Sequence, residues 1–303
     1  MQWLLKSGTQ RIISHLPQSE RINHLFQRHV GRRVPMSEEQ VLKRVDWARR
    51  HLSSLPRSAI DGQLAGVHAY EFGAGWDLTI ALCYWSVGIE RQTVVDIEPH
   101  ARIDLVNHAI SKLSKFGREL PELLRLPVRA LPGDRITSIE QLDERFGIRY
   151  LAPVDASATR LPSDSYSFIT SSDTLEHVPR DDLVPILREC ARIMSPGGVM
   201  SHLIDMMDHY RYVDSHITIY NFLKYSEKQW RWLNSPIEYQ SRLRLPHYRS
   251  AAESAGLTIV EEEVRWPSAA NLNDLANMRV AEPFRDMDLR ELGAKSVRLV
   301  LQP

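Results

Sequence analysis

One turn between a strand pattern and a helix pattern carries the residue types of a cofactor site. An apolar strand pattern ends at Glu71, Gly73 and Gly75 follow, and a helical pattern begins at Asp77. Glycines let the backbone approach a ligand closely, and a helix start presents unpaired N–H groups to the same crevice. A pyrophosphate-binding turn would have a third glycine where Leu78 stands, and its phosphates would be repelled by the two acids. The sequence therefore predicts a ligand that is positively charged and lacks phosphate.

Further polar groups follow the next three strand patterns. Asp96 comes one strand later and is placed to accept both hydroxyls of a ribose. Asp155 can accept an exocyclic amine of adenine, and the small Ala156 leaves room for the ring. The polar turn 171–178 leaves the fourth strand, and strand ends of this kind meet at one edge of an open α/β sheet. The candidate cofactor-binding residues are Glu71, Gly73, Gly75, Asp96, Ile97, Asp155, Ala156, Ser172 and Asp173.

The elements that must position these groups alternate between strand and helix patterns from residue 67 onward. This alternation predicts an α/β fold with a doubly wound, mostly parallel sheet of seven strands. We expect strands at 67–72, 93–97, 149–154, 165–170, 199–204, 257–260 and 296–301, and helices at 77–87, 100–116 and 181–194. We also expect insertions at about 117–147, with one short helix, and at about 206–250. The run Pro196-Gly197-Gly198 is expected to end the helix before it.

The first 60 residues show apolar residues at helical spacing among many basic ones, which predicts three short helices separated by prolines. We interpret residues 1–60 as a helical lid over a main domain at 61–303. Two alternatives stay open. The segment is also suited to binding a partner, or to anchoring at a membrane surface with Trp3, Leu4 and Leu5 touching lipid.

Length, charge and cysteine usage limit the classes of function. The 303 residues are 43% hydrophobic and 25% charged, an ordinary globular composition, and the formal net charge is zero. A neutral chain lacks the global field that recruits nucleic acid, so we expect a small-molecule substrate. No apolar run reaches membrane-spanning length and no secretory signal is present, which predicts a cytoplasmic protein. Cys83 and Cys190 form no paired motif and are expected to be buried hydrophobes. The oligomeric state is not predicted.

In the order and spacing of these features the chain resembles the class I S-adenosylmethionine-dependent methyltransferases. It is most similar to the small-molecule (type 11) group of the ubiquinone and menaquinone C-methylases. The resemblance covers about 67–204 and departs from the pattern at the bulky Trp76. It rests on Glu71-x-Gly73-x-Gly75, Asp96, Asp155-Ala156, the segment 173–178 and the segment 187–198.

The resemblance implies a Rossmann-like methyltransferase fold and S-adenosylmethionine as cofactor. It places Gly73 and Gly75 beside the methionine moiety and Asp96 at the ribose. It also implies that Asp155 and Ala156 border the adenine, and that the turn after the fourth strand lines the path to the methyl group. The expected reaction is in-line transfer of the methyl group to an oxygen, nitrogen or carbon nucleophile of a small or medium-sized molecule.

Such a transfer needs mainly alignment, because the sulfonium methyl is already activated. A base is required only when the nucleophile must lose a proton. His177 is the first candidate base, with pocket shaping as its other interpretation, and His209 is the second catalytic candidate. The acids and imidazoles of 205–216 match no metal-ligand template, so no metal is predicted.

Two other functions remain as alternatives. Tyr220-x-x-x-Lys224 reproduces the spacing of NAD(P)-dependent short-chain-type oxidoreductases, although Leu78 replaces the third glycine and the expected serine is missing. A catalytically silent scaffold with a methyltransferase fold is the second alternative, since an intact site does not prove turnover.

Overall fold

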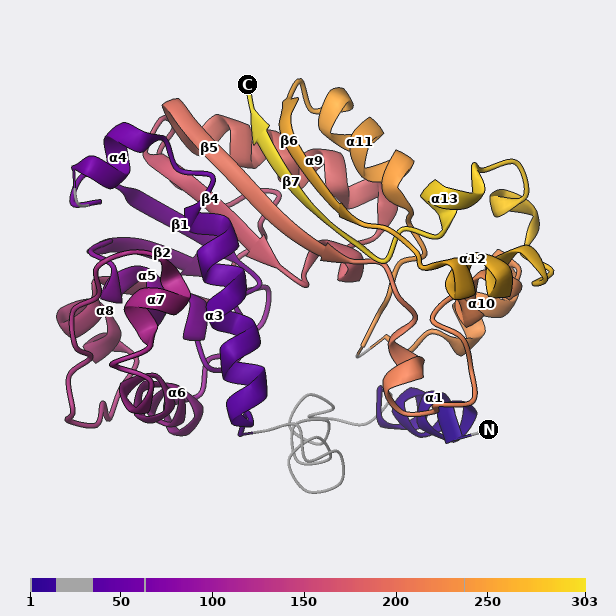
Figure 1. The fold of residues 1–303 in the computed structure, drawn as a ribbon, viewed down its shortest axis with the longest axis horizontal. Helices are drawn as coiled ribbons and strands as arrows, with labels where there is room; N and C mark the ends of the chain where they lie inside the picture. Colours follow the sequence, from indigo (N-terminus) through magenta and orange to yellow (C-terminus); the bar gives the residue numbers. More distant parts are fainter. Residues whose placement is uncertain (1, 15–34, 63, 237) are drawn as a thin grey trace.

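A computed structural model describes residues 2–14, 35–62, 64–236 and 238–303. Its centre is a seven-stranded sheet in the order β3-β2-β1-β4-β5-β7-β6 (Figure 1). The first five strands pair in parallel, and β7 runs antiparallel to both β5 and β6. The strands are β1 (His68–Phe72), β2 (Arg91–Val95), β3 (Ile148–Leu151), β4 (Tyr166–Ser172), β5 (Met194–Asp205), β6 (Thr258–Arg265) and β7 (Ser296–Gln302). The predicted doubly wound, mostly parallel sheet is confirmed.

The strand order changes direction between β1 and β4. The chain steps outward from β1 to β2 and β3, then returns to place β4 on the other side of β1. Open α/β sheets bind ligands at such a switch point, outside the carboxyl ends of the strands. The glycine turn after β1 and the polar turn after β4 therefore flank this crevice.

Helices cover both faces of the sheet, because successive side chains of a strand point to opposite faces. Ala69 and Phe168 face a core shared with α3, α5, α6, α7 and α8, whereas Tyr70 and Ile169 face a core shared with α9 and α11 (Figure 1). These helices are α3 (Glu38–Leu52), α5 (Thr79–Ser86), α6 (Ile103–Lys115), α7 (Leu120–Leu124), α8 (Glu140–Phe146), α9 (Arg180–Ile193) and α11 (Leu245–Ser254). Cys83 and Cys190 are buried in these two cores, as predicted.

Two local predictions are wrong. The segment 117–147 holds two short helices, α7 and α8, because Leu120 and Leu124 form one more buried i,i+4 pair. The run Pro196-Gly197-Gly198 does not end α9, since β5 begins at once at Met194. Residues 196–198 instead lie in an irregularity of the β4–β5 pairing, where Gly197 has φ +75°. The Pro-Gly-Gly run therefore forms a bulge in β5, and glycine is common at such bulges.

Helix α3 is part of the sheet's core. It begins at a capping box between Ser37 and Gln40 and buries Val41, Val45 and Leu52 along one side. Its neighbour His51 is completely buried. Helix α3 thus shares a core with the strands. The domain boundary at residue 60 stays a prediction.

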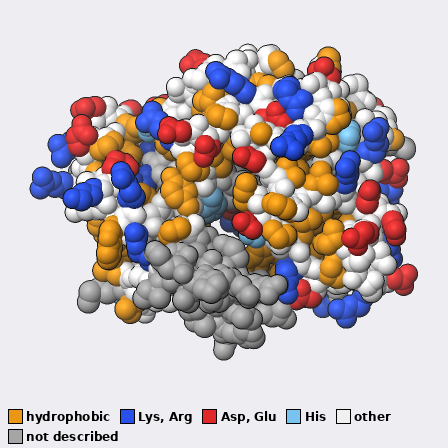
Figure 2. Space-filling model, turned by 180° about the vertical axis from the view of Figure 1, so that it is seen from behind, with side chains coloured by type: hydrophobic (Ala, Val, Ile, Leu, Met, Phe, Trp, Pro, Cys, Tyr) orange, Lys and Arg blue, Asp and Glu red, His pale blue; other side chains and the backbone are white. Residues whose placement is uncertain are grey.

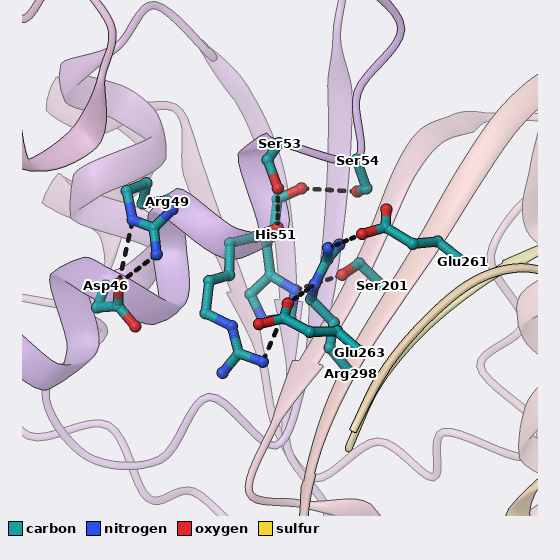
Figure 3. Close-up of polar contacts among 10 residues, drawn as sticks. Asp46, Arg49, His51, Ser53, Ser54, Ser201, Glu261, Glu263 and Arg298 are labelled. Carbon is teal, nitrogen blue, oxygen red and sulfur yellow. Dashed lines mark hydrogen bonds and ion pairs between the residues drawn. The ribbon is translucent and has the colours of Figure 1, made fainter. Parts of the chain in front are cut away.

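The His51 ring ties α3 to two strands. Nδ1 lies 2.8 Å from the Ser201 hydroxyl on β5, and Nε2 lies 2.8 Å from the Ser172 hydroxyl on β4. Figure 3 shows the ring beside Glu263 and Arg298. Glu263 joins Arg50 of α3 at 3.3 Å and Arg298 of β7 at 3.1 Å. Hydrogen bonds and ion pairs thus fix the C-terminal end of α3 to β4, β5, β6 and β7.

A third apolar cluster lies at one end of the molecule, where α1 (Gln2–Ser14), α10 (Glu227–Leu233), α12 (Ala269–Ala276) and α13 (Leu289–Leu292) gather (Figure 1). Trp3 of α1 is 5% exposed and its ring lies 5.3 Å from that of Tyr210. The membrane-anchor alternative is therefore wrong for Trp3, although Leu4 and Leu5 are exposed. The predicted helix between Pro17 and Pro35 lies outside the described residues.

Within the described ranges, no helix has both the length and the apolar character needed to cross a bilayer.

We predict that His51→Ala destabilises the fold. The substitution removes a fully buried ring and leaves the Ser172 and Ser201 hydroxyls without their partner. A cavity together with lost buried hydrogen bonds costs about 2–4 kcal/mol of unfolding free energy. Urea unfolding followed by circular dichroism measures the change. Arg57→Ala, at an exposed ion pair, is the control and should change the unfolding free energy by less than about 0.5 kcal/mol. Equal midpoints for His51→Ala and wild type would contradict the prediction.

Candidate functional site

The loops after the four parallel strands β1 to β4 lie against one another at the carboxyl edge of the sheet. Gly73 N–H donates to the Val95 carbonyl at 2.9 Å, and Val154 N–H donates to the Asp96 carbonyl at 2.9 Å. The Thr174 hydroxyl donates to the Gly73 carbonyl at 3.2 Å. These bonds join the turn after β1 to the loops after β2, β3 and β4. We call this edge the rim.

The turn after β1 depends on two glycines with left-handed backbone. Gly73 has φ +70° and Gly75 has φ +72°. A Cβ on Gly73 would lie 2.3 Å from the methyl carbon of Thr174, whereas a Cβ on Gly75 would meet nothing within 4 Å. Gly73 is therefore required for packing and conformation, and Gly75 for conformation and the space beside it.

The helix start after this turn is capped by an acid. The Asp77 side chain accepts from the Thr79 backbone N–H at 3.0 Å and from the Thr79 hydroxyl at 2.5 Å. A carboxylate in this position satisfies an N–H group that a phosphate would otherwise use. The start of α5 is thus unsuited to an anionic ligand, in agreement with the sequence.

Two buried acids dominate the electrostatics of the rim. Burial, followed by the charge of Asp96, raises the pKa of Glu71 to about 8. Burial raises the pKa of Asp96 to about 7, against the opposing hydrogen bonds from Tyr150 and the Gly75 backbone. The Tyr150 hydroxyl donates to Asp96 at 3.1 Å, and Glu71 Oε2 has no hydrogen-bond partner within the described ranges. Among the described residues, neither acid forms an ion pair, so a cation at the rim would favour both ionised forms.

The outer part of the rim offers apolar surface. Ile97 follows Asp96 and is 62% exposed. Asp155 is exposed and accepts the Ser157 backbone N–H at 2.8 Å, while Ala156 is half-buried. An exposed isoleucine next to a buried acid provides a flat apolar contact beside a hydrogen-bond acceptor.

Two polar side chains of the turn after β4, Ser172 and Asp173, have different surroundings. The Ser172 hydroxyl is already engaged with His51. Asp173, with φ +48°, donates its backbone N–H to the Leu203 carbonyl at 2.9 Å. Burial and the charge of Asp205 raise the pKa of Asp173. Asp173 lines the cavity described next, whereas Ser172 would reach a cofactor only through its backbone.

A cavity of about 600 Å³ opens beside the rim. Histidine and acidic side chains gather in a hollow on the face shown in Figure 2. Residues of the rim, of the turn after β4, of the segment after β5 and of helices α1 and α3 line the cavity. Its lining includes Trp76, Asp173, His177, Asp205, His209 and Trp47. Both catalytic candidates and two of the cofactor candidates, Gly75 and Asp173, thus border one space.

The sequence did not single out the α3 residues of this cavity. Lys43 and Arg44 lie over the Trp47 ring, at 4.6 and 4.2 Å from its centroid. All three line the cavity although they precede the rim by about 30 residues of sequence. The only signal was a basic and aromatic face on a helix whose other face is apolar.

The two candidate catalytic histidines lie together. Their ring centroids are 5.1 Å apart. His177 comes from the 3-10 turn η1 (Leu175–His177) and His209 from η2 (His209–Tyr212). His177 Nδ1 lies 2.6 Å from the Tyr239 carbonyl, which can only accept, so Nδ1 carries the hydrogen and Nε2 the lone pair. Burial, with a smaller contribution from His209, lowers the pKa of His177 to about 4. His177 is therefore a neutral acceptor at pH 7 but a weak base.

His209 has an acid beside it. Its Nε2 lies 3.6 Å from Asp205 Oδ2. Burial raises the pKa of Asp205, but His209, the Met207 backbone and Tyr212 together lower it below its ordinary value. The Asp205 carboxylate is thus placed to orient the His209 ring.

The Tyr220–Lys224 spacing does not form a catalytic pair, because the Tyr220 hydroxyl is buried while Lys224 is exposed. Tyr220 is fully buried and its hydroxyl donates to the Gly293 carbonyl at 2.7 Å. Lys224 Nζ lies 3.4 Å from Asn221 Oδ1. The structure therefore removes the observation on which the oxidoreductase alternative rested.

A family model described as a methyltransferase domain matches residues 136–201, a segment that includes β3, β4 and α9. No curated protein sequence matches the chain. The chain is similar to an S-adenosylmethionine-dependent methyltransferase from Mesorhizobium loti, with 16% identity over 84% of this chain and 96% of that one and a TM-score of 0.45. It is also similar to one from Archaeoglobus fulgidus, with 13% identity over 93% and 99% of the two chains and a TM-score of 0.47.

Residues 136–201 thus match a methyltransferase domain, and they lie in a sheet with the doubly wound topology described above.

Proposed function

We propose that the protein binds S-adenosylmethionine along the rim and transfers its methyl group to an oxygen, nitrogen or carbon nucleophile of a small or medium-sized molecule in the cavity. The observation that carries this proposal is the pair of buried, unpaired acids Glu71 and Asp96 at the glycine turn. A cofactor with a sulfonium and an ammonium group would supply the positive charge that these acids lack.

Each part of the cofactor has a complementary group at the rim. The Asp96 carboxylate has acceptor capacity left for the ribose hydroxyls besides Tyr150 and the Gly75 N–H. The exposed Ile97 would pack against the adenine ring, with Asp155 and Ala156 on its border. The methionine moiety would follow the glycine turn, which brings the sulfonium to the mouth of the cavity at Gly75.

The transfer breaks the bond between sulfur and the methyl carbon and leaves its electron pair on sulfur. The acceptor's lone pair forms the new bond, and an acceptor that carried a proton releases it. Nε2 of His177 is a fixed hydrogen-bond acceptor that holds a proton weakly. We therefore propose that His177 orients the group that receives the methyl. His209, with Asp205 beside it, is the better candidate to receive the proton.

The N-terminal segment would cover the acceptor. Lys6 and Gln10 of α1 and Gln40 of α3 line the cavity. Lys6 is held by Glu238 at 2.6 Å, so α1 is anchored to the segment after β5. This arrangement supports the interpretation of residues 1–60 as a lid.

Calorimetry with S-adenosylmethionine, S-adenosylhomocysteine and NAD tests the function. We expect the first two to bind one molecule per chain and NAD not to bind. Binding of NAD alone would overturn the proposal in favour of an oxidoreductase. Cofactor binding without consumption of S-adenosylmethionine, across a panel of hydroxyl, amine and carbon acids, would favour the silent scaffold.

We predict that cofactor affinity rises with pH through about pH 7. Asp96 must be ionised to accept both ribose hydroxyls, and its pKa in the free protein is about 7. Below this pH, binding must first remove a proton, so the affinity should fall by up to about tenfold per pH unit. Calorimetry with S-adenosylhomocysteine between pH 5.5 and about 8 measures the slope.

Asp96→Asn is the matching variant for this profile. Asp96→Asn should bind the cofactor more weakly, and its affinity should vary less with pH because position 96 no longer titrates. Without the Asp96 charge, the pKa of Glu71 should also fall. Asp134→Asn, whose side chain is 93% exposed, should behave as wild type. A wild-type affinity that does not vary with pH, or full affinity in Asp96→Asn, would contradict the assignment.

We predict that Gly73→Ala abolishes measurable cofactor binding while the protein still folds. The new Cβ would collide with Thr174 and would hold a backbone with φ +70°, so the turn must move. Gly133→Ala, where a Cβ meets nothing within 4 Å, is the control. Calorimetry and far-ultraviolet circular dichroism on both variants separate binding from folding. Wild-type affinity in Gly73→Ala would show that the turn does not contact the cofactor.

A further inference from the structure

Three potential metal ligands from two separate turns meet beside the cavity, which His177 and His209 line. One donor atom each from Glu176, His177 and His209 lies within 4.8 Å of the others. Glu176 and His177 belong to η1 after β4, and His209 begins η2 after β5. Because β4 and β5 are neighbouring parallel strands, both turns emerge at the same edge of the sheet. The sequence spacing of 33 residues could not reveal this group.

We propose that Glu176, His177 and His209 bind a divalent first-row transition-metal ion. Two imidazoles and one carboxylate, with further positions open, form a ligand set that zinc and iron(II) use in proteins, whereas magnesium and calcium prefer oxygen ligands. Ligand atoms around a tetrahedral ion lie about 3.4 Å apart for bonds of about 2.1 Å, so the three side chains would draw closer on binding.

The His177 ring is already oriented as a ligand. Its Nδ1–H donates to the Tyr239 carbonyl at 2.6 Å, which leaves the lone pair on Nε2. Metal-binding histidines commonly donate their second nitrogen to a carbonyl or carboxylate in this way.

Only one oxygen of the Glu176 carboxylate has a hydrogen-bond partner among the described residues. It is fully buried, and its Oε1 accepts the Asp205 backbone N–H at 3.3 Å, whereas Oε2 has no hydrogen-bond partner. A buried carboxylate oxygen without a partner costs free energy that a bound cation offsets.

The surrounding charges also favour a cation. The acidic side chains of Asp173 and Asp205 lie near Glu176 and add negative charge to its surroundings. Lys43 and Arg44 of α3 act on Asp173 from a distance, but within the described part of the chain neither Asp173 nor Glu176 forms an ion pair. Asp205 Oδ2 lies 3.6 Å from His209 Nε2 and accepts the Tyr212 hydroxyl at 3.0 Å, which positions it to orient the His209 ring.

The metal would face the acceptor. His177, His209 and Asp205 all line the cavity beside Gly75. This inference rests on the proposed methyl transfer. A metal ion at this position would favour methyl acceptors whose oxygen can coordinate it, such as a hydroxyl beside a second oxygen. With the ion bound, the lone pairs of His177 and His209 go to the metal, which then takes over from the two side chains in orienting the methyl acceptor. A coordinated hydroxyl loses its proton more easily than a free one.

Cobalt(II) titration of the full chain, after treatment with a chelator and its removal, tests the site. Co²⁺ is the probe because visible absorption reports its coordination by imidazole and carboxylate. We expect one Co²⁺ per chain, displaced by Zn²⁺. His177→Ala and His209→Ala should each weaken Co²⁺ binding by at least about tenfold. His216→Ala removes a third histidine of the same segment and should bind Co²⁺ as wild type does.

Binding of S-adenosylhomocysteine is measured on every variant as an independent control of folding. If a histidine variant fails to fold, the near-isosteric Glu176→Gln takes its place, with the same expected loss. A wild type that binds S-adenosylhomocysteine but no Co²⁺ overturns the metal site and leaves the methyltransferase proposal intact. Co²⁺ affinity retained in both histidine variants also overturns it. A chain that binds Co²⁺ but neither cofactor form keeps the metal site and overturns the proposed function.

Discussion

Buried carboxylates without cationic partners are the constraint on which this structure depends. Glu71 and Asp96 at the rim, and Glu176 at the cavity, are each almost completely withdrawn from water. Moving an ionised carboxylate into such surroundings is unfavourable unless a charge or hydrogen bonds compensate. A fold keeps such groups when a ligand supplies the missing charge, which is why strongly shifted pKa values gather at functional sites. The cationic cofactor and the proposed metal ion both answer this same requirement.

Helix α3 links the stability of the sheet to the shape of the site. Its apolar side packs in the core beneath β1 and β4, and His51 is hydrogen bonded to both β4 and β5. Its opposite side carries Lys43, Arg44 and Trp47 to the cavity. A single helix therefore holds the turn after β4 in place and also forms one wall of the cavity.

The two histidines have different surroundings and suit different roles. His177 is held by a backbone carbonyl and stays neutral, which suits a fixed acceptor or ligand. His209 has the Asp205 carboxylate beside it, which suits an imidazole that gains charge during the reaction. Their proximity follows from the pairing of β4 with β5, because each ring stands in the first turns beyond its strand.

The sequence by itself determined the sheet, the glycine turn and the acids at the strand ends. These features are local, since a strand pattern, a turn that needs positive φ and the acid beside it are written within a few residues. It failed where the outcome depended on pairing between distant segments. The Pro-Gly-Gly run became a bulge because Met194 already pairs with Tyr166, and Ser172 turned to His51 because α3 packs behind β4. Only the tertiary structure could bring Glu176, His177 and His209 together or bury Tyr220, because proximity and burial are properties of packing between elements rather than of spacing within one.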